Sequence, residues 1–167
     1  TVKQMGGRVE IKSTPGKGTR ITVSLPTNLS ILDALIVRVN GNQYAVPTQD
    51  LTEVVDLAGF GGPGHCIELR GKAVPVENLA LFLKSLGDTS AAVPSSRARP
   101  GLIVFHRDEP VVLEVDEVLG QQQIYVRPLN SLLAPASFYG GSTILSDGDP
   151  AIILNLPEMA RQFFTSH

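Results

Sequence analysis

The sequence predicts a mainly β fold made of two small five-stranded barrels that pack together. Residues 35–46 consist of two apolar runs around the turn Asn40-Gly41-Asn42, which is the pattern of a β-hairpin. Residues 101–115 repeat this order of parts. Segments 71–79 and 148–156 also match, because each starts at a turn glycine and ends in Asn-Leu before a helical pattern. The chain therefore contains a duplicated unit of about five short strands.

Composition limits the classes of function. The chain is 43% hydrophobic, which is enough for a core, and its net charge of −2 gives no basic footprint for nucleic acid. We expect no direct membrane insertion, because no apolar run reaches about 18 residues. The single cysteine, Cys66, excludes an internal disulfide and fits a cytoplasmic protein. The start lacks an initiator Met and a signal peptide, which suggests a fragment of a longer cytoplasmic chain.

Residues 1–26 form the first predicted piece. Residues 9–12 and 20–25 alternate apolar and polar side chains, and the turn-rich segment 13–18 separates them. This pattern predicts one hairpin, closed by Pro26. Two strands alone are marginally stable, so we expect that the hairpin belonged to a larger domain.

The first unit of the duplication is predicted to form one barrel over about residues 34–86. Pro47 cannot donate a ladder hydrogen bond, so a bend or bulge is expected there. A glycine-rich loop is expected at residues 59–64, and Asn78 is a candidate cap for a short helix. The further strands are expected at residues 51–57, 66–69 and 73–76.

The second unit repeats this plan after a surface linker at about residues 87–99, which is rich in Ser, Ala and Pro. A second barrel is expected over about residues 100–156 and a C-terminal helix over about 157–164. Neither unit has much core of its own. We therefore expect the two barrels to share an apolar seam.

The segment GGRVEIKSTPGKGTRITVSLP resembles the C-terminal end of the ATP-binding domain of histidine kinases. The resemblance implies that Gly16, Gly18 and Thr19 are the remnant of a motif that closes a nucleotide site. Glycines suit this role because the backbone can approach a phosphate closely. The other nucleotide-binding motifs of that family are absent, so the fragment is expected to be non-catalytic and to bind no cofactor. A plain hairpin turn is the alternative interpretation.

Residues 27–164 resemble the CheW-like domain of bacterial chemotaxis proteins. The matching segments are NGNQYAVPTQDLTEVVDL, IELRGKAVPVENLALFL, VDEVLGQQQIYVRPL and GGSTILSDGDPAIILNL. An ATP-binding-domain end followed by a CheW-like domain is similar to the C-terminal part of the CheA family of chemotaxis histidine kinases. The resemblance implies two SH3-like five-stranded barrels side by side.

This resemblance implies a regulatory and scaffold function. The expected partners are a CheW-like coupling protein, bound through an end-to-end barrel contact, and the cytoplasmic tip of chemoreceptors in membrane receptor arrays. ATP and Mg²⁺ would belong to the parent kinase, and that kinase would form a homodimer through a domain outside this fragment. The alternatives are a hybrid kinase of a motility pathway, a fragment with residual nucleotide binding, and an unrelated SH3-like interaction module.

The residues that could carry catalysis are scattered. The three histidines, His65, His106 and His167, are far apart in sequence, and the sequence indicates no nucleophile with a base partner and no metal site. The acidic pairs at 108–109 and 147–149 fall where hairpin turns are expected, and Asp favours turns.

Partner contacts are expected instead from apolar residues near strand ends and from two arginines. The candidates are Leu51, Val54, Val55, Leu69, Arg70, Val74, Val76 and Arg127. For the apolar members the alternative is the barrel core, because alternation along a strand places every second side chain inside.

Overall fold

The computed structural model describes residues 8–16, 18–24, 30–58, 66–86, 99–129 and 137–165. The chain divides into two compact units, Thr1–Ser30 and Ile31–His167. The predicted domain boundary was at Pro26, close to this division. The predicted loop at 59–64 and residues 87–98 of the predicted linker lie outside the described residues.

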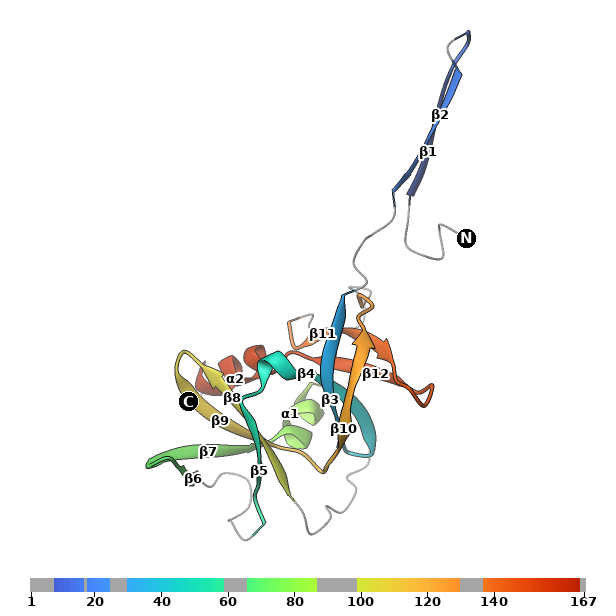
Figure 1. Cartoon of the computed structure of the whole chain (residues 1–167). Coiled ribbons are helices and arrows are strands. Elements are labelled where there is room, and N and C mark those ends of the chain that lie inside the picture. Colours follow the sequence, from blue (N-terminus) through green and yellow to red (C-terminus); the bar gives the residue numbers. More distant parts are fainter. Residues whose placement is uncertain are drawn as a thin grey trace. The chain divides into compact units, whose positions relative to one another are not determined.

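The N-terminal unit is a two-stranded antiparallel hairpin, as predicted (Figure 1). Its strands are β1 (Arg8–Thr14) and β2 (Gly18–Ser24). Ile11 faces Ile21 across the ladder, and both side chains are about two-thirds exposed. The turn needs its glycines for backbone reasons, because Gly16 and Gly18 have φ angles of 73° and 102°, which L side chains disfavour.

The C-terminal unit contains two five-stranded sheets (Figure 1). The first sheet has the strand order β10-β3-β4-β12-β11. A bridge between Arg127 and Ser142 joins the chain after β10 to β11, with both N···O distances at 2.8 Å. This bridge links the two edges of the first sheet into a barrel. Its strands are β3 (Ile31–Val39), β4 (Asn42–Pro47), β10 (Glu117–Tyr125), β11 (Tyr139–Ile144) and β12 (Pro150–Leu154).

The second sheet has the strand order β5-β8-β9-β7-β6, and all its strands lie between residues 53 and 114. A short 3-10 helix, η1 (Thr48–Asp50), follows the predicted bend at Pro47 and leads from the first sheet into the second. Within the described residues, no β-pairing joins the edge strands β5 and β6. The strands are β5 (Glu53–Asp56), β6 (Cys66–Leu69), β7 (Lys72–Asn78), β8 (Pro100–His106) and β9 (Glu109–Glu114).

The number of sheets and of strands in each confirms the predicted fold class, but the predicted barrel compositions, 34–86 and 100–156, were wrong. Each hairpin pairs with the later strands of the other repeat. Strand β3 pairs with β10, and β4 runs parallel to β12. In the same way β8 pairs with β5, and β9 runs parallel to β7. A duplicated sequence shows which parts recur, but it does not show which copies pair.

The predicted apolar seam between the two sheets is confirmed. Seam side chains come from both sheets and include Val37, Tyr44, Leu102 and Leu113. The helices α1 (Leu79–Ser85) and α2 (Leu156–Thr165) add Leu79, Leu83, Leu156 and Met159 to the same cluster. Each sheet also encloses a smaller core of its own.

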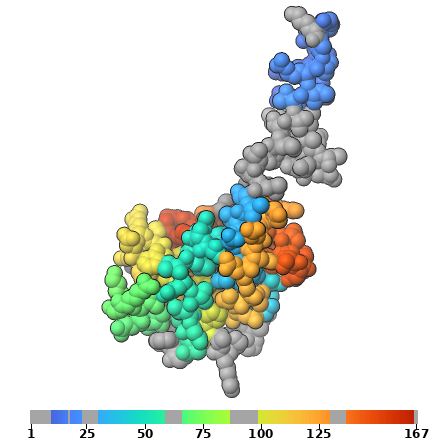
Figure 2. Space-filling model, viewed as in Figure 1, coloured from blue at the N-terminus to red at the C-terminus, as the bar shows by residue number. Residues whose placement is uncertain are grey.

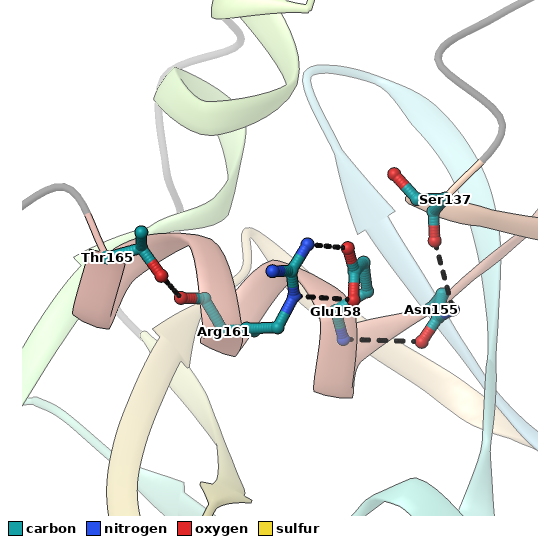
Figure 3. Close-up of polar contacts among 5 residues, drawn as sticks. All are labelled: Ser137, Asn155, Glu158, Arg161 and Thr165. Atoms are coloured by element: carbon teal, nitrogen blue, oxygen red, sulfur yellow. Dashed lines mark hydrogen bonds and ion pairs between the residues drawn. The ribbon is translucent and has the colours of Figure 1, made fainter.

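Both helices start at the asparagine that the repeat places there. Asn78 Oδ1 accepts a hydrogen bond from the N–H of Leu81 at 2.9 Å. Asn155 Oδ1 accepts from the N–H of Glu158 at 3.3 Å, and Asn155 Nδ2 donates to the carbonyl of Ser137 (Figure 3). Arg161 forms a two-bond ion pair with Glu158, and this bonding lowers the pKa of the Glu158 carboxyl. The side-chain oxygens of Asn78 and Asn155 each satisfy a free N–H group in the first turn of the helix that follows.

Candidate interaction surface

The second sheet carries a shallow, mostly apolar pocket at one end. Its volume is about 160 Å³, and its lining comes from β5, the β6–β7 turn, β8 and the β8–β9 turn. Phe105, which is 45% exposed, and the buried Ile103 supply apolar surface from β8. In Figure 2 the teal, green and yellow surfaces that contain these segments lie next to one another. The lining residues are Thr52, Glu53, Leu69, Arg70, Lys72, Ile103, Phe105, Asp108 and Pro110.

Charged side chains form the rim of this pocket. Arg70 Nη2 lies 3.5 Å from Glu53 Oε2, and this contact bridges the β6–β7 turn and β5. The Arg70 side chain is 76% exposed, so the pair is weak and contributes at most about 1 kcal/mol. Arg70 has a φ of +51° and precedes Gly71 at +78°, the backbone signs of a tight hairpin turn. The turn thus places the cation of Arg70 at the pocket that Phe105 also lines.

The predicted partner-contact residues separate into different environments. Leu69 and Arg70 line the pocket, and Val54 is 46% exposed on the edge strand β5. Val55 is partly buried against the core of the second sheet. Leu51 is partly buried against the seam.

Two of the predicted contact residues are core residues. Val74 is 0% exposed and Val76 is 1% exposed, and both belong to the core of the second sheet. Burial removes the surface that a partner would touch, so the core alternative holds for this pair. The reason is alternation along β7, in which Val74 and Val76 point to the same face.

Arg127 lies in the first sheet and not beside the pocket. Its backbone N–H and carbonyl form the bridge to Ser142, so the residue closes the first barrel through its main chain. Gly141 next to this bridge has a φ of +143°, and a Cβ there would lie 2.7 Å from the Arg127 carbonyl oxygen. Only glycine fits so close an approach.

Sequence reasoning missed Phe105, Lys72 and Pro110 as members of the pocket. Phe105 follows Leu102, Ile103 and Val104 in an apolar run that indicates a buried strand. All three of these neighbours are buried, whereas Phe105 is exposed. The signal available in the sequence was its place one residue before the polar turn 106–109.

A cluster of charges surrounds the passage from β9 to β10. Asp116 Oδ2 accepts a hydrogen bond from the N–H of Asn40 at 2.7 Å, and Arg38 pairs with Glu117. Burial raises the pKa of the Asp116 carboxyl, and the charge of Glu114 adds to this effect. The hydrogen bond from Asn40 and the charge of Arg38 oppose it.

A second ion pair fixes the start of β8. Arg99 donates two hydrogen bonds of 2.7 Å to the carboxylate of Glu114, whose side chain is 8% exposed. Hydrogen bonding to Glu114 raises the pKa of the Arg99 guanidinium. A bidentate pair of this kind constrains geometry more tightly than a single contact.

In the described part of the chain, no group of three or more histidine, cysteine or acidic residues is arranged to hold a metal ion. His106 stacks on Phe164 of α2, with ring centroids 6.0 Å apart. The acidic segment 147–149 forms a turn, as predicted, in which Asp147 Oδ1 accepts from the N–H of Asp149 at 3.0 Å. His65 and His167 lie outside the described residues. Cys66 is exposed at the start of β6.

The predicted nucleotide-motif remnant forms the turn of the N-terminal hairpin. Thr19 Oγ1 lies 3.0 Å from Ser13 Oγ, and a Cβ on Gly16 or Gly18 would meet nothing within 4 Å. The glycines are therefore explained by their positive φ angles, which the turn itself requires. No helix of the described residues is long and apolar enough to cross a membrane.

Comparison with known proteins agrees with this architecture. The sequence model of the CheW-like domain family matches residues 33–164, which is most of the chain. The chain belongs to the CheW-like domain family. The solved scaffolding protein TtCheW from Thermoanaerobacter tengcongensis has a TM-score of 0.58 at 21% identity, covering 75% of this chain and 90% of that protein. That likeness supports the fold of the CheW-like domain.

Curated relatives of this CheW-like domain include much longer proteins. The chain is 32% identical over 162 residues to the chemotaxis protein CheA of Salmonella typhimurium, covering 93% of this chain and 23% of that protein. It is 31% identical to CheA of Cereibacter sphaeroides, covering 99% and 24%, and 28% identical to the gliding motility regulatory protein of Myxococcus xanthus, covering 95% and 20%. The chain thus spans about a quarter of the length of these relatives and is homologous to part of CheA.

Proposed function

We propose that this CheW-like domain is the regulatory and scaffold domain of a chemotaxis-type histidine kinase. It binds a CheW-like coupling protein and the cytoplasmic tip of chemoreceptors, and it couples the state of the receptor to kinase activity. Homology to CheA along 93% of the chain supports this proposal. The domain itself performs no catalysis, and the parent kinase works in the cytoplasm at membrane receptor arrays.

The contact with the coupling protein is assigned to the pocket end of the second sheet. The observation that carries this assignment is the exposed Phe105 beside a mostly apolar pocket with the charged rim Glu53, Arg70, Lys72 and Asp108. An aromatic side chain in a pocket with a polar rim is the usual composition of an interface centre. A coupling protein with the same fold can present a similar barrel end, so the contact is end to end.

The test is a calorimetric titration of the domain with a purified CheW-like coupling protein from the same cell. Phe105→Ala should weaken binding at least tenfold, because truncation of a central aromatic residue typically costs 2 kcal/mol or more. Tyr125→Ala is the matched control, since Tyr125 is an aromatic residue of the first sheet that is 55% exposed. Equal effects of the two substitutions would refute the assignment. Failure of the unsubstituted domain to bind at high micromolar concentration would refute it as well.

The remaining finer expectations form part of the same proposal. ATP and Mg²⁺ belong to the parent kinase, and so does a homodimer contact outside this chain. A saturable calorimetric response of this chain to ATP would contradict the assignment as a scaffold that binds no nucleotide. The relative in gliding motility supports a second candidate, a kinase of a motility pathway. Binding of this chain to coupling proteins from a chemotaxis pathway and from a motility pathway separates the two candidates. The chain should bind more tightly to the coupling protein of the pathway in which its parent kinase works.

A further inference from the structure

The strand pairings of the C-terminal unit fall into two groups. We name residues 31–86 the leading half and residues 99–165 the trailing half. Within the described residues, the pairings inside a half are the hairpins β3–β4, β6–β7, β8–β9 and β11–β12, with the Arg127–Ser142 bridge. The other four pairings join the two halves, namely β3–β10, β4–β12, β5–β8 and β7–β9.

In the parts of the two halves that the structure describes, neither half therefore contains a sheet of its own beyond hairpins. Strand β5 pairs only with the trailing half in the described structure, and β10 pairs along its length with β3 of the leading half. Isolated two-stranded hairpins are marginally stable in water. Each half must gain most of its stability from the other.

Side chains and main chains across the boundary support this dependence. Phe82 of the leading half packs against Phe138 and Phe163 of the trailing half, with ring centroids 5.3 and 5.1 Å apart. The N–H of Leu57 donates to the carbonyl of Arg99 at 2.8 Å, and the N–H of Asp116 donates to that of Arg38 at 3.0 Å. The seam contains buried side chains from both halves.

The exchange is reciprocal, as in a symmetric dimer. Hairpin β3–β4 of the leading half completes the sheet that holds β10, β11 and β12 of the trailing half. Hairpin β8–β9 of the trailing half completes the sheet that holds β5, β6 and β7 of the leading half. Swapping of an identical element between two copies is a low-cost route to a dimer. One chain here contains both copies, and residues 87–98 are the single covalent connection between them.

We propose that the two halves are complementary binding partners, and that the connection through residues 87–98 is dispensable for the folded state. A half from a second copy of this chain can then replace the half in the same chain. This inference concerns the assembly of the domain and does not depend on its role in signalling.

The test uses the full chain with a specific protease site inserted between residues 87 and 98. After cleavage, the two pieces should elute together in gel filtration without denaturant. After unfolding in denaturant, the refolding rate of the cut protein should rise with concentration, because refolding has become bimolecular. The uncut protein with the same insertion is the control, and its refolding rate should not depend on concentration.

The exchange between copies is measured with cut protein in isotopically labelled and unlabelled forms. Unfolding and refolding of an equal mixture should place about half of the leading pieces with a trailing piece from the other population in native mass spectrometry. Separation of the pieces under native conditions would overturn the proposal. Refolding of each piece alone, at a rate independent of concentration, would overturn it as well.

A pair of variants keeps the test sharp. Leu102→Ala removes a fully buried seam side chain, so it should weaken the association of the cut pieces roughly 100-fold, since such truncations cost about 3 kcal/mol. Leu81→Ala changes a side chain that is 62% exposed and should leave association within about twofold. Equal effects would show that the seam does not hold the halves together.

Discussion

The two sheets of this CheW-like domain share one strand plan but differ in how their edges end. In the first sheet, two backbone hydrogen bonds between Arg127 and Ser142 join the edges. In the second sheet, the described residues give no backbone pairing between β5 and β6, and the exposed pair Arg70–Glu53 spans them at one end. Closed edges suit a structural role, whereas open edges leave surface for partners.

The second sheet contains both exposed side chains and a largely buried ion pair. The second sheet displays Val54 on its edge strand β5 and Phe105 on the neighbouring β8, and it keeps the ion pair Arg99–Glu114 largely inside. This sheet therefore combines a strongly held start of β8 with a weakly held rim.

The largest expected effect tests whether the two sheets are one folding unit. Leu113→Ala empties a seam position in the second sheet, and Leu154→Ala does the same in the first. Each change should lower the free energy of unfolding by about 3 kcal/mol, because both side chains are fully buried. Thermal unfolding followed by calorimetry and circular dichroism should show one shared transition for each variant. Two separated transitions would mean that the sheets unfold independently.

The next effect concerns the ion pair of the second sheet. Glu114→Gln removes the charge that faces Arg99 and should lower the free energy of unfolding by about 2 kcal/mol, because the guanidinium loses a charged partner in a largely buried site. Urea denaturation measures this loss. Glu53→Gln is the control at the exposed pair and should cost less than about 0.5 kcal/mol. A loss of similar size in both variants would remove the contrast between the start of β8 and the rim.

The closure of the two sheets can be compared directly. Ser142→Pro removes the N–H that donates to Arg127 and restricts the backbone of β11, so it should cost at least about 1.5 kcal/mol, the upper end for one lost hydrogen bond. Ser142→Ala retains that N–H and serves as the control. Arg70→Ala in the second sheet should change stability by less than about 0.5 kcal/mol. If Arg70→Ala were as costly as Ser142→Pro, the second sheet would be closed by that side chain.

The smallest effect lies at the passage between the sheets. The pKa of Asp116 is raised above its ordinary value of 3.8, mainly by burial. The folded state therefore holds this proton more tightly than the unfolded chain, and its contribution to stability falls as pH rises from about 4 through the raised pKa. The variant Asp116→Asn has no carboxyl at this position and therefore lacks this pH-dependent contribution to stability. The variant should gain stability relative to the parent over that pH range, as measured by urea denaturation at successive pH values, and a relative loss would contradict the assignment.

Local chemistry explains which features were predictable. The turns at Asn40-Gly41 and Arg70-Gly71 and the helix cap Asn78 were evident because each depends on a few adjacent residues, and the repeat placed Asn155 before the second helical pattern. The exchange of hairpins was not, because β3 and β10 are far apart in the chain and their pairing has no local signature. In the candidate site, Leu69 and Arg70 were predictable because they directly precede the turn glycine Gly71. Phe105 was hidden in an apolar strand, and alternation alone could not show the face taken by Val74.

The exposed position of Cys66 has a practical consequence. It is the only cysteine in the sequence, and it lies on β6, an edge strand of the second sheet. A maleimide dye or spin label can therefore be attached at one defined point without engineering the chain. Such a probe would report by fluorescence or by magnetic resonance when another molecule approaches this edge, and every variant described above would carry the same attachment point.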